Sequence, residues 1–292
     1  MAQVERTVML KALYISGFLL LGLGLLYYFA ALQTFNFLVP KDQGSLLAVR
    51  DVAYGADARQ KVDVYKPSEG TGPWPIVVFV HGGSWQSGSK DPYEFIGRAL
   101  AAEGFVAMLI NYRLHPQNKY PAFVEDTALA LKWAGANGGQ YGGDTSRLFA
   151  MGHSAGAYNI AMAVLDKRYA GDVPPLKGVV TLAGPFDFVP LDSSITIEVF
   201  GHLADLQDTQ PVNHLRADAP AFLILHGRDD STVKIKNAEA LKRGLDSVGA
   251  KAELIIYDGI SHVDIMLALS KPLRGRAPVL ADAVAFMRGK SQ

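Results

Sequence analysis

The chain has 292 residues, of which 49% are hydrophobic, so it can bury a full core and is not a disordered segment. Its 28 basic and 28 acidic residues give a formal net charge of zero, and no basic stripe is visible, so we expect no nucleic-acid partner. The sequence contains no cysteine, which excludes disulfides, thiolate metal sites and a lipid-modified N-terminal cysteine.

The N-terminal segment is uncharged from Ala12 to Leu32. As a helix rising about 1.5 Å per residue, this run matches the roughly 30 Å hydrocarbon core of a bilayer. Two tyrosines at 27–28 and a phenylalanine at 29 are typical of an interfacial aromatic belt. We therefore expect residues 1–33 to be a transmembrane helix that anchors the protein to a membrane.

The charges beside this run predict its orientation. Arg6 and Lys11 precede it closely, whereas the first basic residue after it is Lys41. The positive-inside bias then leaves the N-terminus in the cytoplasm and places the catalytic domain on the periplasmic or extracellular side. Two alternatives stay open: a signal peptide whose cleavage releases a secreted protein, and a buried core helix.

Residues 34–292 are expected to form one domain, which begins with two antiparallel strands at 47–54 and 61–65. Continuous apolar runs with intervening amphipathic segments follow, as expected for buried parallel strands alternating with helices. The further strands are expected at 76–80, 105–110, 147–151, 177–182, 221–225 and 252–257, and the helices at 93–103, 121–133, 157–165, 238–248 and 281–288.

This alternation predicts an α/β fold with a mostly parallel sheet covered by helices on both faces. In such sheets ligands bind beyond the carboxyl ends of the strands. Residues 184–220 break the rhythm because they are long and mixed in character, and we expect a short lid-like insertion there. We see no internal repeat and no second domain.

Residues 152–156 read GHSAG, a G-x-S-x-G pattern between an apolar strand and an apolar helix. A serine on a sharp strand-to-helix turn has a strained backbone, and the glycines keep side chains out of its way. The turn exposes the hydroxyl above the sheet edge. Ser154 is therefore the candidate nucleophile.

Serine needs a base to take its proton, and the base needs a carboxylate to orient it. His262 follows the last predicted strand on a glycine-containing turn, and Asp230 follows the strand at 221–225. The order Ser154, Asp230, His262 is that of the α/β-hydrolase triad. Asp229 is the local competitor for the acid, and Asp264 a weaker one.

An oxyanion needs N–H donors, and the segment HGGSW at 81–85 directly follows the strand at 76–80. Its two glycines allow the backbone to turn N–H groups inward. We expect Gly82, Gly83 and Ala155 to form the oxyanion hole, in which losing one donor costs roughly 2.7–4 kcal/mol of barrier.

From about residue 49 onward the chain resembles the carboxylesterases of the α/β-hydrolase fold, a group that includes hormone-sensitive-lipase-like esterases and kynurenine formamidases. The resemblance rests on HGGSW at 81–85, NYRL at 111–114, GGDTSRLFAMGHSAG at 142–156, HGRDDSTV at 226–233 and GISH at 259–262. It implies the Ser-His-Asp mechanism and places the acid on Asp230. Where many relatives carry a third glycine, this chain has Ser84.

The sequence thus predicts a serine carboxylesterase that hydrolyses short-chain esters of small molecules through an acyl-enzyme, without metal or cofactor. Trp85, Tyr112 and Phe186 are candidate walls of its substrate pocket. An arylformamidase that uses the same triad on an N-formyl aromatic amine is the nearest alternative. A non-catalytic binding module with a hydrolase fold is a more remote one.

Overall fold

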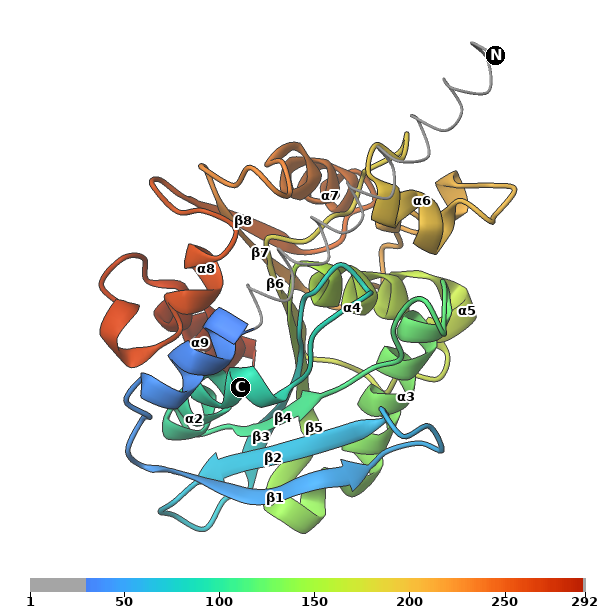
Figure 1. Ribbon diagram of the computed structural model, residues 1–292. Helices are drawn as coiled ribbons and strands as arrows, with labels where there is room; N and C mark the ends of the chain where they lie inside the picture. Colours follow the sequence, from blue (N-terminus) through green and yellow to red (C-terminus); the bar gives the residue numbers. More distant parts are fainter. Residues whose placement is uncertain (1–29, 291–292) are drawn as a thin grey trace, which may run out of the picture.

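The computed structural model describes residues 30–290, which form one sheet with helices packed against it (Figure 1). Eight strands lie in the order β1-β2-β4-β3-β5-β6-β7-β8. The pairings β1–β2 and β2–β4 are antiparallel, and all other pairings are parallel. The strands are β1 (Ser45–Ala53), β2 (Lys61–Pro67), β3 (Trp74–Val80), β4 (Val106–Ile110), β5 (Gly143–His153), β6 (Gly178–Leu182), β7 (Phe222–Gly227) and β8 (Ala252–Tyr257).

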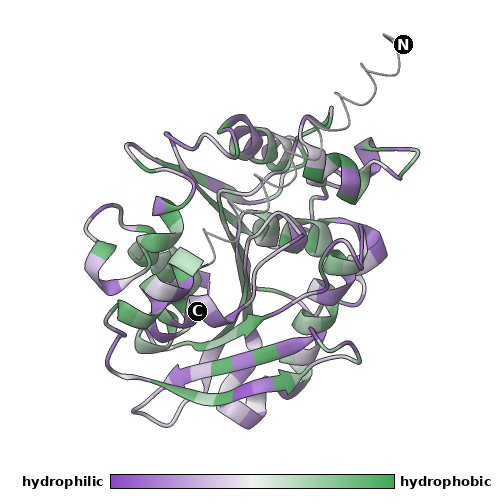
Figure 2. Cartoon of the chain, in the orientation of Figure 1, coloured by the Kyte–Doolittle hydropathy of each residue, from purple (hydrophilic) through white to green (hydrophobic). Residues whose placement is uncertain are grey.

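The central strands are buried on both faces, as their unbroken apolar runs predict. Every residue of β4 and β6 is buried. The edge strand β1 instead mixes half-buried and exposed positions, and Figure 2 shows hydrophilic and hydrophobic segments along it. The predicted α/β class with a mostly parallel sheet is confirmed.

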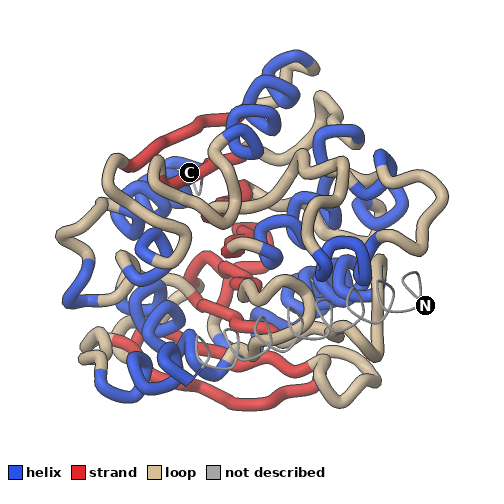
Figure 3. Tube along the Cα trace, turned by 45° about the horizontal axis from the view of Figure 1, so that its top comes forward, coloured by secondary structure: helices blue, strands red, loops and turns tan. Residues whose placement is uncertain are grey.

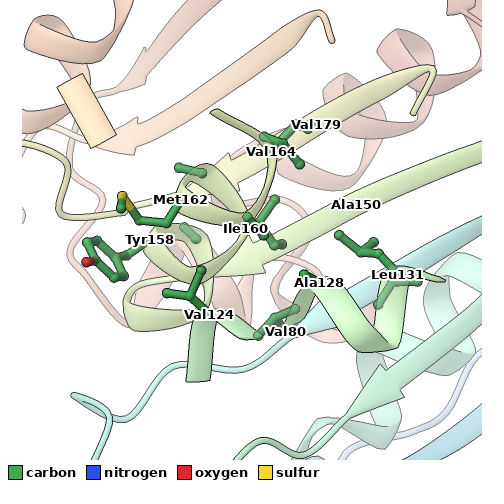
Figure 4. Close-up of a cluster of buried hydrophobic side chains, with 14 of the residues drawn as sticks. Val80, Val124, Ala128, Leu131, Ala150, Tyr158, Ile160, Met162, Val164 and Val179 are labelled. Carbon is green, nitrogen blue, oxygen red and sulfur yellow. The ribbon is translucent and has the colours of Figure 1, made fainter. Parts of the chain in front are cut away.

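Helices lie on both sides of the sheet (Figure 3). One face is covered by α3 (Ala122–Asn137), α4 (Ala155–Leu165) and α7 (Lys236–Ser247), whose apolar side chains share one core cluster. Figure 4 shows how α3 and α4 bring Val124, Leu131 and Ile160 into this cluster. The other face is covered by α2 (Glu94–Ala102), α8 (Asp264–Leu267) and α9 (Val279–Lys290).

The segment 184–220 carries α6 (Ser194–Phe200) and two short 3-10 helices, Gln207–Thr209 and Pro211–Asn213. A reciprocal pair of hydrogen bonds between Ser193 and Thr196 caps the start of α6. At its end Phe200 is fully buried, with its ring 4.9 Å from that of Trp85. The short helix α5 (Lys167–Ala170) lies between α4 and β6.

The first described element is a helix at residues 30–38, which packs beside α2 (Figure 1). The rings of Phe35 and Phe95 meet edge to face at 5.5 Å, and the Asn36 carboxamide accepts a hydrogen bond from the Phe95 N–H. Apart from its last three residues, the predicted span at 12–32 lies outside the described residues. Within residues 30–290, no helix combines the length and apolar character needed to cross a bilayer.

Candidate active site

Ser154 occupies the turn between β5 and α4, at the carboxyl end of a central strand. Its backbone has φ 54° and ψ −123°, a conformation that costs a non-glycine residue about 1–3 kcal/mol. The Ser154 N–H donates to the carbonyl of Leu182 on neighbouring β6, at 2.8 Å. The turn therefore holds the hydroxyl above the sheet edge, where the G-x-S-x-G pattern predicts it.

Both glycines of that pattern are required by close backbone approaches. A Cβ added at Gly156 would lie 2.1 Å from the carbonyl oxygen of Val80, and one added at Gly152 would lie 2.7 Å from the Gly156 backbone. Neither gap can hold a methyl group. The sharp turn is possible only because α4 touches the ends of β3 and β5 without side chains between them.

The structure brings Ser154, His262 and Asp230 together from three separate loops. His262 Nε2 lies 2.9 Å from the Ser154 hydroxyl, and His262 Nδ1 lies 2.7 Å from Asp230 Oδ2. A carboxylate can only accept, so Nδ1 carries the proton and Nε2 is free to accept from Ser154. This is the tautomer that a general base needs.

The Asp230 carboxylate is buried but well supplied with donors. Its Oδ1 accepts from the N–H groups of Thr232 and Val233 at 2.9 and 2.8 Å. Burial alone would raise the pKa of Asp230, but the His262 hydrogen bond, the histidine's charge and the backbone donor outweigh it and lower this pKa below the ordinary aspartate value. Asp230 therefore stays ionised beside the imidazole at neutral pH.

The glycine loop, residues 81–85, lies against the serine. A Cβ at Gly82 would come within 3.0 Å of the Ser154 Cβ. The loop is held by its own turn, because the Gly83 carbonyl accepts from the N–H groups of Gln86 and Ser87. Ala155 is the first residue of α4, so its N–H has no acceptor within the helix. Gly82 therefore lies beside the Ser154 side chain, and the Ala155 N–H has no acceptor within its own helix.

A pocket of 440 Å³ opens at Ser154. Its walls come from the glycine loop, the start of α4, the segment 184–220 and the residues that follow Asp230. Lining residues include Ser84, Trp85, Ala155, Phe188, Ile195, Thr196, Val233 and Lys234. Of these, only Trp85 and Ala155 are in the predicted site. Ser84 adjoins the glycine pair and could have been included on that ground, whereas no motif in the sequence marks the others as pocket residues.

The structure places two of the predicted pocket walls, Tyr112 and Phe186, in the core. Both are fully buried, and neither lines the pocket at Ser154. Tyr112 stacks on His81 at 4.5 Å and donates its hydroxyl to the His81 carbonyl, so it supports the glycine loop from beneath. The backbone N–H of Phe186 donates to the buried side chain of Asn237, and the phenyl ring belongs to the core cluster.

The architecture and the serine turn define the α/β-hydrolase class. Within it, the chain belongs to the BD-FAE family, whose model matches residues 62–245, well over half of the chain. The resemblance to α/β-hydrolase carboxylesterases seen in the sequence is thereby confirmed.

Several curated relatives are ester hydrolases. A probable isoprenylcysteine alpha-carbonyl methylesterase, ICMEL1 of Oryza sativa subsp. japonica, is 31% identical over 80% of this chain and 61% of its own length. Esterase LipC of Mycobacterium tuberculosis is 30% identical over 68% of this chain and 55% of its own. The chain therefore spans little more than half the length of these relatives.

Solved structures share the fold. A truncated carbohydrate esterase from gut microbiota superposes with a TM-score of 0.75 at 23% identity, covering 87% of this chain and 99% of the other. The C6-C4 SN3 inhibited esterase B of Lactobacillus rhamnosis superposes with a TM-score of 0.78 at 18% identity, covering 91% of this chain and 94% of the other. At these identities the structural similarity is evidence for the fold alone.

Proposed function

We propose that this protein is a serine carboxylesterase that hydrolyses short-chain carboxylic esters through Ser154, His262 and Asp230. The carrying observation is the unbroken chain of contacts from hydroxyl to imidazole to carboxylate, at 2.9 and 2.7 Å. The named relatives that are ester hydrolases support the same reaction class.

In the first half of the reaction, Ser154 Oγ attacks the ester carbonyl while its proton passes to His262 Nε2. Asp230 stabilises the resulting imidazolium through its hydrogen bond to Nδ1. The imidazolium then returns the proton to the leaving alcohol. The acyl group stays on Ser154 as an ester of the enzyme.

In the second half, water gives its proton to His262 and attacks the acyl-enzyme, and the acid leaves as Ser154 regains its proton. Both steps place negative charge on the former carbonyl oxygen. The N–H groups of Gly82, Gly83 and Ala155 are the proposed donors to that oxyanion. Because these donors are fixed before the substrate arrives, they need no reorganisation when the charge develops.

The pocket favours small acyl or alcohol groups. Its 440 Å³ are bounded on one side by Trp85, which is locked by a 2.9 Å hydrogen bond from its indole N–H to Asn159. The segment 184–220 closes another side through Phe188 and Ile195. Trp85 and Ile195 are buried and Phe188 is half-buried, so this wall does not yield readily to a long chain.

The test is hydrolysis of p-nitrophenyl esters of increasing acyl length by the wild type and by Ser154→Ala. We expect turnover that is highest for short acyl groups and absent from the variant. Equal hydrolysis by the variant would refute the assigned nucleophile. Hydrolysis of an N-formyl aromatic amine in place of every ester would move the function to the arylformamidase.

We also propose that residues 1–33 anchor the enzyme and that its catalytic domain faces the periplasmic or extracellular side. The support is the uncharged run at 12–32 and the two basic residues before it. Carbonate-washed membranes should retain the full chain, and protease added outside the cytoplasm should digest the catalytic domain. Recovery of a shortened chain in the medium would instead indicate a cleaved signal peptide.

A further inference from the structure

His153, the residue before the nucleophile, is a buried group that the proposed reaction does not use. Its side chain, at the end of β5, is 2% exposed and does not line the substrate pocket. The ring is 4.8 Å from that of His262, tilted by 42°. His153 Nε2 lies 2.9 Å from the main-chain carbonyl of His262. The side chain thus spans from the serine turn to the backbone of the base.

The proton on His153 can be assigned from these contacts. A carbonyl oxygen only accepts, so Nε2 carries the hydrogen and Nδ1 holds a lone pair. Burial, and secondarily the neighbouring His262, lower the pKa of His153 to about 3, so the ring is neutral over the working pH range. It is therefore a permanent donor toward the His262 carbonyl.

The other face of the ring meets the glycine loop. A Cβ at Gly82 would lie 3.1 Å from His153 Nδ1. That nitrogen is buried with no hydrogen-bond partner within residues 30–290. Leaving a buried acceptor unpaired is destabilising. An apolar ring of the same shape would avoid that cost but would lack the bond made by Nε2.

The histidine loop, residues 258–263, is tied by hydrogen bonds on both sides of His262. The Ile260 carbonyl accepts from the Asp229 N–H, and Ser261 bonds to the Asp264 carboxylate. The carbonyls of Ser261 and Val263 accept from N–H groups of the helix that follows, so the bond from His153 is the one made at His262 itself. Among the described residues, no second donor reaches the His262 carbonyl. Asp230 binds the His262 imidazole at Nδ1, and His153 binds the main-chain carbonyl of the same residue.

We propose that His153 is a positioning residue: its Nε2–H holds the main chain of His262 so that the imidazole faces Ser154. This inference rests on the proposed esterase function. Loss of the bond lets the histidine loop shift, and a displacement near 1 Å at a reacting group costs on the order of 100-fold in rate. Substrate binding is untouched, because His153 does not line the pocket.

The test compares His153→Phe, which keeps a buried ring without the donor, with His153→Gln, whose Nε2–H stands near the position of the imidazole Nε2–H. We expect His153→Phe to lower kcat about 10- to 100-fold with KM unchanged, and His153→Gln to stay within about tenfold of the wild type. Thr181→Val, a buried isosteric change on neighbouring β6, serves as the matched control and should leave kcat unchanged.

The second readout is the rate at which a fluorophosphonate modifies Ser154, since that reaction needs an aligned His262 and no knowledge of the substrate. We expect it to fall in His153→Phe by the same factor as kcat, while the thermal midpoint stays at or above that of the wild type. Equal rates in His153→Phe and the wild type would overturn the proposal and leave the esterase function standing. A wild-type chain that the probe does not label would overturn both.

Discussion

At the scale of single residues, the neighbours Asp229 and Asp230 differ in burial and in their contact with His262. Asp230 is buried and bonded to His262 Nδ1, with two backbone N–H groups on its other oxygen. Asp229 is exposed, and its backbone N–H donates to the Ile260 carbonyl. Sequence position alone leaves both candidates open, because they are neighbours on one turn. The direction of the side chain decides between them, because the Asp230 carboxylate bonds to His262.

Asp230→Asn should lower kcat on a p-nitrophenyl ester by about 10⁴-fold, because an amide in place of the carboxylate favours the wrong imidazole tautomer. Asp229→Asn is the matched control and should change kcat less than about twofold. Steady-state kinetics of both variants decide the point. A large loss in the Asp229 variant with little in the Asp230 variant would reverse the assignment.

At the same scale, the limits of the sequence are visible in the pocket. Ser154, His262 and Asp230 are predictable because each follows a strand in a local pattern with a mechanical reason. Tyr112 follows a strand in the same way, yet its hydroxyl bonds beneath the glycine loop to the His81 carbonyl. Whether a side chain lines the pocket or enters the core depends on its direction from the backbone. No pattern in the sequence encodes that direction.

At the scale of secondary-structure elements, the serine turn depends on the contact of α4 with β3. Gly156→Ala would place a methyl group 2.1 Å from the Val80 carbonyl, a distance that no side-chain adjustment relieves. We expect this variant to lose soluble expression or ester hydrolysis altogether. Gly139→Ala, where an added Cβ meets nothing within 4 Å, should fold and act as the wild type does. Soluble yield and the thermal midpoint measure both.

The sequence does not predict the helix α6 within the lid-like insertion, because its apolar residues are spaced among polar ones over only seven positions. Its anchor is Phe200, fully buried among Trp85, Phe123, Tyr158 and Phe188. The insertion is thus joined to the main core, and it shapes one wall of the pocket.

Phe200→Ala should destabilise the protein by about 3–5 kcal/mol, the usual cost of truncating a buried phenylalanine. Phe37→Ala is the matched control, because Phe37 is 85% exposed, and its effect should stay within about 0.5 kcal/mol. Denaturant melts of both variants give the comparison. If the two variants unfold at the same denaturant concentration, α6 is not anchored by Phe200.

At the scale of the whole molecule, the class of fold was predictable from alternating apolar strands and amphipathic helices, and the strand positions agree closely with the sequence. The longer extent of β5 was not, because its first four residues, Gly143 to Ser146, lack an apolar run, and Gly143 and Asp144 pair with the start of β3. Tertiary pairing extends a strand beyond its apolar run.

Several buried histidines make the whole fold sensitive to acid. Burial lowers the pKa of His81 and of His153 to about 3, against 6.5 for a free imidazole. Between these values the unfolded chain binds protons that the folded chain does not, so stability falls as the pH drops below about 6.5. Carboxylates such as Asp230, whose pKa is lowered, remain charged over most of this window.

We therefore expect the thermal midpoint to fall steadily from pH 7 to pH 4.5. His153→Gln removes one of the buried imidazoles, and its midpoint should fall less over the same range. Scanning calorimetry at several pH values measures both slopes. A midpoint that stays constant or rises on acidification would show that these rings are not held neutral in the folded protein.

The central claim is that the fold places His262 and Asp230 so that they activate Ser154 as a nucleophile. It is tested most directly by treating the full chain with a fluorophosphonate and locating the adduct by peptide mass spectrometry. We predict one adduct, on Ser154, that is lost in His262→Gln and in Ser154→Ala. An unmodified wild-type chain, or an adduct on another residue, would contradict the account.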